Sequence, residues 1–213
     1  MLIVFDLDGT LVDSRQDLAD SANAMLARYG AAQLPQDLIV TMVGDGAPTL
    51  VRRVCAAAGL PSVPNDALES FLAHYDARLL NHTRPYPGTR EMLESVVKKA
   101  TLAVLTNKPG APSRQILEGT GLVTFFQYMV AGDGRWGRKP SPRGLHWLMT
   151  QAAATGATTL LVGDSIVDLQ TARASGVAIC LARYGFGFDS IPRHQLTSED
   201  RMIDTPTELL TLV

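Results

Sequence analysis

The chain has 213 residues, of which 46% are hydrophobic and 19% are charged, and its formal net charge is −2. This composition is that of an ordinary globular protein and excludes a disordered chain or a coiled coil. The small net charge and the absence of a Lys/Arg stripe argue against nucleic acid or an anionic membrane as a partner. The length allows one α/β core, alone or with a smaller inserted domain.

The start of the chain and its two cysteines predict a reducing, intracellular setting. Residues 1–5 are too short for the apolar region of a signal peptide and lack a basic lead, so the cytoplasm is the expected location. Cys55 and Cys180 lie far apart without C-x-x-C spacing, which predicts reduced packing residues. The four histidines show no metal-ligand spacing.

The first predicted element is a buried strand at Leu2–Phe5, and Asp6 and Asp8 follow directly after it. Residues two apart on a strand share a face, so both carboxylates can address one site at its carboxyl end. Two charges about 4 Å apart repel by about 4 kcal/mol at an effective dielectric constant near 20, so a cation must offset them. An oxygen-only ligand set favours Mg²⁺. The alternative is an Asx turn before Gly9.

The next segment reads as helical, with predicted helices at 21–29, 49–58 and 66–80 and no strand between them. We expect a helical cap domain of residues 15–86, inserted into a core of residues 1–14 and 87–213. The return through Arg84-Pro85-Tyr86-Pro87 is a stiff connection suited to a hinge.

Within this segment, Gly44-Asp45-Gly46 precedes a predicted helix whose positive end could face the core. Gly46 and Arg52 are therefore candidate substrate-binding residues, because Arg52 and Arg53 lie about one turn further along and one of them could pair with a carboxylate. The alternative is an ordinary interhelical turn with solvated arginines.

Four further apolar runs, at 102–105, 128–131, 160–162 and 177–181, alternate with helical segments. Continuous apolar runs are typical of parallel strands that are covered on both faces, so we predict a doubly wound α/β sheet. Helix starts are predicted at Pro87-Gly88-Thr89, at Ser141-Pro142 and at a capping box in residues 205–208. In such sheets ligands bind beyond the carboxyl ends of the strands.

Polar residues follow the strands after the first one: Thr106, Lys139, Asp164 and Asp168. Except for Asp164, which adds a carboxylate at a strand end as Asp6 does, each has an ordinary explanation by itself. Thr106 is suited to a helix cap, Lys139 to a solvated surface, and Ser165 with Asp168 to a capping box. Together with the Asp6 and Asp8 pair, they occur in order at four strand ends of one sheet, which indicates a common site for phosphoryl chemistry.

Asp6-x-Asp8, Thr106, Lys139 and Gly163-Asp164 with Asp168 together resemble the four motifs of the haloacid dehalogenase superfamily of phosphatases. The resemblance covers essentially the whole chain, including the helical insertion. It implies that Asp6 forms an aspartyl-phosphate, that Asp8 is the acid and base, and that Thr106 and Lys139 hold the phosphoryl group. It also implies that Mg²⁺ is ligated by Asp6, Asp164 and the backbone carbonyl of Asp8, with Asp168 as a ligand or a support.

The sum of the formal charges at the site supports the roles of these residues. With Asp8 protonated, the carboxylates of Asp6, Asp164 and Asp168 total −3, while Mg²⁺ and Lys139 total +3, so the site is neutral. Without Lys139 the total is −1, and a phosphate dianion and the transition state would lose a main stabiliser. The dehalogenases of this superfamily lack an acid at the position of Asp8, which favours a phosphatase or a phosphomutase.

Four segments resemble phosphoglycolate phosphatases within the superfamily: residues 5–14, 43–46, 106–109 and 184–187. They imply a small phosphate ester, 2-phosphoglycolate, as the substrate, with Asn107 and Lys108 among the substrate-binding residues. Lys108 could neutralise a second anionic group on it. The alternatives are a sugar phosphate such as N-acetylmuramic acid 6-phosphate, a phosphomutase resembling β-phosphoglucomutase, and a receiver-like signalling domain. Residues 132–137 have no assignment, and a monomer or a homodimer is expected.

Overall fold

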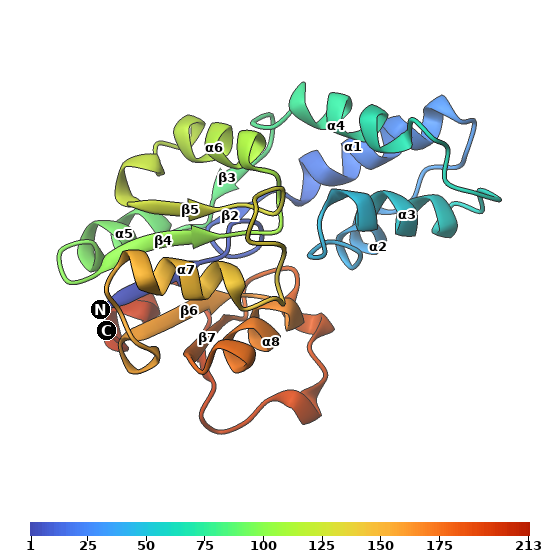
Figure 1. Ribbon diagram of the computed structural model, residues 1–213. Coiled ribbons are helices and arrows are strands. Elements are labelled where there is room, and N and C mark those ends of the chain that lie inside the picture. Colours follow the sequence, from blue (N-terminus) through green and yellow to red (C-terminus); the bar gives the residue numbers. More distant parts are fainter.

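The computed structural model describes residues 1–213 and contains one six-stranded parallel sheet (Figure 1). Along the sheet the strand order is β5-β4-β1-β6-β7-β8. The strands are β1 (Leu2–Phe5), β4 (Thr101–Leu105), β5 (Tyr128–Val130), β6 (Thr159–Gly163), β7 (Ala178–Ala182) and β8 (Arg201–Ile203). The predicted α/β class with a doubly wound parallel sheet is confirmed.

Helices cover both faces of this sheet, and β1 shows how the sequence divides between them. Ile3 and Phe5 belong to one buried cluster, while Leu2 and Val4 belong to the other, because successive strand residues point to opposite faces. The first cluster includes residues of α5 (Thr89–Val96) and α6 (Gly110–Gly119). The second includes residues of α7 (Arg143–Gln151) and α8 (Ile166–Ser175). The strands are apolar at successive positions because each strand contributes side chains to a buried core on both faces of the sheet.

A helical insert, defined here as α1 to α4, lies beyond the carboxyl ends of the strands, and both chain termini lie at the opposite end of the sheet (Figure 1). Its helices are α1 (Arg15–Arg28), α2 (Gln36–Val40), α3 (Ala47–Ala57) and α4 (Ala67–Asp76). The two connections to the sheet run side by side, because β2 (Val12–Asp13) pairs antiparallel with β3 (Arg84–Pro85). The insert is thus attached through one short ribbon.

The return connection is also fastened to the insert itself. Asp17 of α1 is fully buried, and its carboxylate accepts hydrogen bonds from the backbone N–H groups of His82 and Thr83 and from the Thr83 hydroxyl. Charge-assisted bonds of this kind are stronger than neutral ones, so they fix where the chain leaves α4 and enters β3.

Several local predictions differ from the structure. Strand β8 was not predicted, because it is short and begins with the exposed Arg201. Residues 206–211 form a 3₁₀ helix without a side-chain cap from Thr205, where an α-helix with a capping box was predicted. Helix α7 starts one residue later than predicted, so that Pro142 is its N-cap. Cys55 and Cys180 are buried and unpaired, as predicted. No helix has the length and apolarity that crossing a membrane requires.

Candidate active site

Three carboxylates converge where β1 and β6 end. These strands are neighbours, with Phe5 opposite Val162, so the residues that follow them emerge side by side. Oxygen atoms of Asp6, Asp164 and Asp168 lie within 4.8 Å of one another. The sequence prediction that carboxylates from separate segments meet at this edge of the sheet therefore agrees with the geometry.

The carboxylate of Asp164 is held by two hydrogen bonds and by close contact with two glycines. Its Oδ1 accepts a hydrogen bond from the Thr10 hydroxyl at 3.1 Å, and its Oδ2 accepts one from the Gly187 N–H at 2.8 Å. Gly9 has φ +85°, and a Cβ on Gly9 would overlap the Asp164 carboxylate. Gly185 packs against the same carboxylate. The two glycines let the loop after β1 and the loop after β7 approach Asp164 closely.

Lys139 joins two members of the cluster. Its Nζ lies 2.9 Å from Asp6 Oδ1 and 2.6 Å from Asp168 Oδ1, and only 2% of its side chain is exposed. The other oxygen of Asp168 accepts hydrogen bonds from the backbone N–H and the hydroxyl of Ser165 at the start of α8. The predicted capping box is therefore present, and Asp168 also holds Lys139. Both of its oxygens are already hydrogen-bonded.

The charges of this cluster are unbalanced without a further cation. Burial raises the pKa of Asp6 to about 7, although Lys139 opposes the shift. Burial, together with the charges of Asp168 and Asp6, also raises the pKa of Asp164 well above its usual range. Three carboxylates face one ammonium group, so a hard divalent cation with oxygen ligands fits the site, and Mg²⁺ has that preference.

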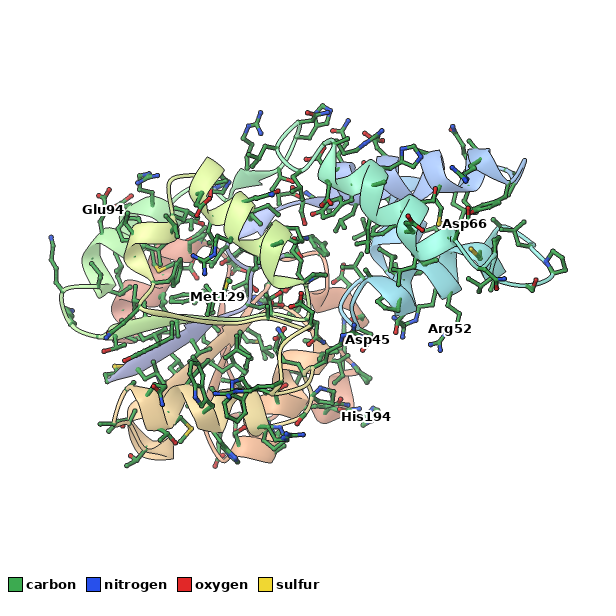
Figure 2. The ribbon with its side chains drawn as sticks, turned by 45° about the horizontal axis from the view of Figure 1, so that its top comes forward. Asp45, Arg52, Asp66, Glu94, Met129 and His194 are labelled. Carbon is green, nitrogen blue, oxygen red and sulfur yellow. The ribbon has the colours of Figure 1, made fainter.

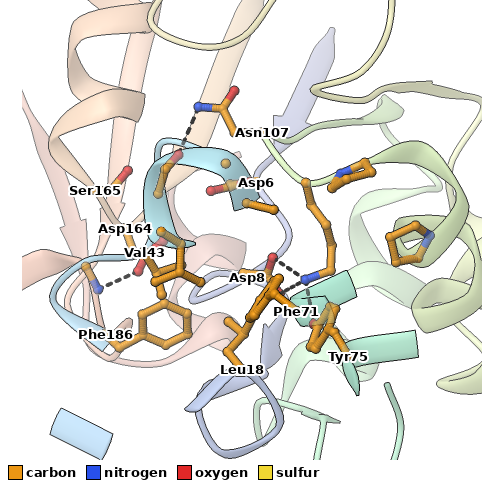
Figure 3. A pocket seen from close by; sticks show the side chains of 18 of the residues that line it. Asp6, Asp8, Leu18, Val43, Phe71, Tyr75, Asn107, Asp164, Ser165 and Phe186 are labelled. Atoms are coloured by element: carbon orange, nitrogen blue, oxygen red, sulfur yellow. Dashed lines mark hydrogen bonds and ion pairs between the residues drawn. The ribbon is translucent and has the colours of Figure 1, made fainter. Parts of the chain in front are cut away.

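Asp8 lies beside this cluster and has its own cation. Its carboxylate accepts a hydrogen bond from the Ser14 hydroxyl at 2.6 Å and pairs with Lys108 Nζ at 2.8 Å (Figure 3). The same nitrogen donates to the hydroxyl of Tyr75, on α4 of the helical insert, at 2.6 Å. Lys108 therefore connects the loop after β4, the second aspartate and the insert.

Thr106 and Asn107 shape the loop after β4. Thr106 is buried, and its hydroxyl accepts a hydrogen bond from the Lys108 N–H at 3.2 Å. Asn107 is held internally: its amide nitrogen donates to the carbonyls of Gly44 and Lys139, and its amide oxygen accepts from the Lys139 N–H. The Asn107 side chain thus holds Lys139 and the insert in place, and its contact with substrate stays a prediction.

The segment 132–137, which had no sequence assignment, packs against the loop after β4. Gly132 donates its N–H to the Lys108 carbonyl at 2.9 Å, and a Cβ on Gly132 would overlap the Asn107 backbone. Asp133 accepts a hydrogen bond from the Gly110 N–H at the start of α6. These contacts fix the backbone of residues 107–110.

A cavity of about 60 Å³ lies between the sheet edge and the helical insert, enough for about four to six water molecules. The core contributes the carboxylates, and the insert contributes an apolar wall (Figure 3). Among the lining residues are Asp6, Asp8, Asp164, Asn107, Lys108, Gly46, Leu18, Leu50, Phe71, Leu72 and Tyr75. Tyr75 was missed by sequence reasoning, because one turn after Phe71 it has the spacing of a core residue.

The two candidate residues of the insert lie in different surroundings. Gly46 lines the cavity, with φ +87° and close to the Asn107 carbonyl. The prediction for Arg52 finds no support in this geometry, because Arg52 is exposed and does not line the cavity, and Figure 2 shows it at the surface of the insert. Helix α3 turns Leu50 and Val51 inward, so the residue after them faces solvent. Arg53 pairs with Asp45 instead.

Comparisons with known proteins agree with this geometry. A family model described as haloacid dehalogenase-like hydrolase matches residues 3–182. A phosphoglycolate phosphatase of Cupriavidus necator is 39% identical over 187 residues, which cover 86% of this chain and 81% of that protein. A phosphoglycolate phosphatase of Haemophilus influenzae is 34% identical over 220 residues, covering 100% and 97%.

A solved structure also matches this chain over almost its whole length. A crystal structure of a predicted phosphoglycolate phosphatase from Haemophilus somnus has a TM-score of 0.90 and 33% identity, and the match covers 99% of this chain and 96% of that one. The family model spans most of the chain. In this chain the carboxylates at the strand ends and Lys139 lie together. The chain belongs to the haloacid dehalogenase-like hydrolases.

Proposed function

We propose that this protein is a Mg²⁺-dependent phosphatase that hydrolyses 2-phosphoglycolate through an aspartyl-phosphate on Asp6. The observation that carries the proposal is the convergence of Asp6 and Asp164 at one end of the cavity, with Lys139 paired to Asp6. The names of the relatives support the choice of ester.

Asp6 is the proposed nucleophile. Its Oδ1 accepts hydrogen bonds from the Leu7 N–H at 2.7 Å and pairs with Lys139, which leaves Oδ2 free to attack phosphorus. The attack forms an O–P bond and breaks the bond from phosphorus to the ester oxygen. Lys139 and the buried hydroxyl of Thr106 stabilise the charge on the phosphoryl oxygens.

Asp8 is the proposed acid and base. It gives a proton to the departing alkoxide, and it then takes a proton from the water that attacks the aspartyl-phosphate, so the products are glycolate and phosphate. The Ser14 hydroxyl, 2.6 Å from Asp8 Oδ1, orients this carboxyl group. Asp8 lines the same cavity as Asp6, so both steps take place in one space.

The proposed metal site consists of Asp6, Asp164 and the backbone carbonyl of Asp8. Bound Mg²⁺ would neutralise charge on the phosphoryl oxygens and reduce their repulsion from the carboxylates. Asp168, a candidate ligand by sequence, is proposed to act chiefly by positioning Lys139, because its oxygens already accept hydrogen bonds from Lys139 and Ser165.

A panel of esters tests this function: 2-phosphoglycolate, N-acetylmuramic acid 6-phosphate and glucose 1-phosphate, each with Mg²⁺ or with EDTA. We expect Mg²⁺-dependent phosphate release that is fastest with 2-phosphoglycolate and absent in Asp6→Asn. The same change at the exposed Asp37, Asp37→Asn, is the matched control. Full hydrolysis by Asp6→Asn, or an isomerised sugar phosphate in place of free phosphate, would contradict the proposal.

A further inference from the structure

Tyr75 presents its hydroxyl group to the end of the cavity beside Lys108. The residue is only 2% exposed, and its hydroxyl oxygen lies 2.6 Å from Lys108 Nζ. Its ring stacks on Phe71, one turn earlier on α4, with centroids 5.8 Å apart and an interplanar angle of 11°. Both aromatic residues line the cavity (Figure 3). The position of the hydroxyl group is therefore fixed by packing.

The hydrogen atom of this hydroxyl group has no acceptor in the protein. Lys108 carries an ammonium group that only donates, so in their contact the Tyr75 oxygen accepts. No other hydrogen bond involves the Tyr75 hydroxyl. Burial raises the pKa of Tyr75, so the phenol keeps its hydrogen. Because Tyr75 lines the cavity, this hydrogen is placed to be donated to an acceptor group on a ligand bound there.

The charges that line the cavity indicate what that acceptor is. Lys108 is the only cationic side chain among the lining residues, and the other charged ones are Asp6, Asp8 and Asp164. An anionic group that lies away from the phosphoryl end of a substrate therefore meets one phenolic donor and one ammonium group, which it shares with Asp8. The neighbouring side chains Phe71, Leu72 and Leu18 are apolar and offer no competing hydrogen bond.

We propose that Tyr75 and Lys108 form a carboxylate-binding site, through which the helical insert selects phosphate esters of small hydroxy acids over neutral phosphate esters. This inference rests on the proposed function and adds a residue of the insert to it. A carboxylate would accept one hydrogen bond from the Tyr75 hydroxyl and one from Lys108, and bonds to a charged acceptor are the stronger kind. An ester that ends in a neutral group makes weaker bonds there.

The test compares 2-phosphoglycolate with 2-hydroxyethyl phosphate, in which CH₂OH replaces the carboxylate. We expect the parent protein to prefer 2-phosphoglycolate by roughly tenfold or more in kcat/KM. Tyr75→Phe keeps the ring and its stacking on Phe71 but removes the hydroxyl group. In this variant KM for 2-phosphoglycolate should rise roughly tenfold with a smaller change in kcat, and the preference between the esters should fall by a similar factor.

Tyr29→Phe is the matched control, because the Tyr29 hydroxyl donates to Asp66 within the insert and Tyr29 does not line the cavity. This variant should keep the parent's preference. Equal hydrolysis of the two esters by the parent would overturn the inference alone, as would an equal loss on both esters in Tyr75→Phe. A parent that hydrolyses neither ester overturns the proposed function as well, so the two failures are distinguishable.

Discussion

The side chain of Asn107 makes two hydrogen bonds with the backbone of Lys139. Its amide oxygen accepts from the Lys139 N–H at 2.7 Å, and its amide nitrogen donates to the Lys139 carbonyl at 3.0 Å. The same nitrogen donates to Gly44 of the insert at 2.9 Å. The residue that follows Thr106 therefore sets the position of the lysine that pairs with Asp6, and it also contacts the helical insert.

This arrangement predicts the effect of Asn107→Asp. A carboxylate keeps the bond from the Lys139 N–H but loses both donated bonds and faces two carbonyl oxygens. We expect kcat/KM for 2-phosphoglycolate to fall roughly tenfold or more, because a small displacement of a positioning group weakens stabilisation of the transition state. Steady-state kinetics measure it. Asn81→Asp, the same change at an exposed site, should have no effect.

Lys139→Ala should affect both stability and turnover. It leaves two carboxylates, Asp6 and Asp168, without their shared cation, and a broken buried ion pair costs about 3–5 kcal/mol. Turnover should fall by about 10²-fold or more, because the phosphoryl group loses its ammonium partner. Thermal unfolding and phosphate release measure the two effects. The exposed Lys98→Ala is the control, and near-normal turnover by Lys139→Ala would refute the proposed role.

The sequence predicts the sheet edge better than the insert, for a physical reason. The carboxyl ends of parallel strands meet at one edge, so the positions of Asp6 and Asp164 follow from recognising two strands. The face of a helix that meets the core depends on packing, which spacing alone does not fix. Spacing therefore did not reveal that Arg52 is exposed, and Tyr75 has the same spacing from Phe71 that a purely structural residue would have.

Asn107 shows a second limit of sequence reasoning. Its place at the end of β4 is evident from the apolar run before it, but its partners Gly44 and Lys139 lie 63 and 32 residues away along the chain. A polar residue at a strand end is equally compatible with contact to a substrate and contact to another loop. Only the folded arrangement of the loops separates these two roles.

Gly46→Val tests the approach of the insert to the core. Gly46 has φ +87°, and its Cβ would lie 3.2 Å from the Asn107 carbonyl oxygen and 3.2 Å from Arg138 Nε. We expect kcat/KM for 2-phosphoglycolate to fall roughly tenfold or more, since the insert must move to relieve these contacts. Gly30→Val is the matched control, because Gly30 has φ +67° and nothing within 4 Å of its Cβ.

The backbone strain of the two variants should be similar, about 1–2 kcal/mol for a side chain in the left-handed region. A loss of activity that is confined to Gly46→Val therefore reports the contact with the core. If both variants lose activity and thermal stability to the same extent, strain within the insert explains the loss, and the proposed contact between Gly46 and the core is unimportant for turnover.

Mg²⁺ should stabilise the folded protein. Asp6, Asp164 and Asp168 are close together with only Lys139 among them, so a divalent cation relieves their repulsion in the folded state and finds no such cluster in the unfolded chain. A concentration of 100 times the dissociation constant corresponds to about 2.7 kcal/mol. The melting temperature should rise with Mg²⁺, fall again with EDTA, and respond little to NaCl of the same ionic strength.

The variant Asp164→Asn distinguishes Mg²⁺ binding at this site from weak Mg²⁺ binding at the protein surface. The amide keeps the size of the side chain but removes one of the converging charges, so the rise in melting temperature with Mg²⁺ should be largely lost. Asp37→Asn, at an exposed position, should respond as the parent does. Because the readout is unfolding, the result does not depend on the choice of ester. An unchanged response in Asp164→Asn would place the cation elsewhere and remove the proposed ligand set.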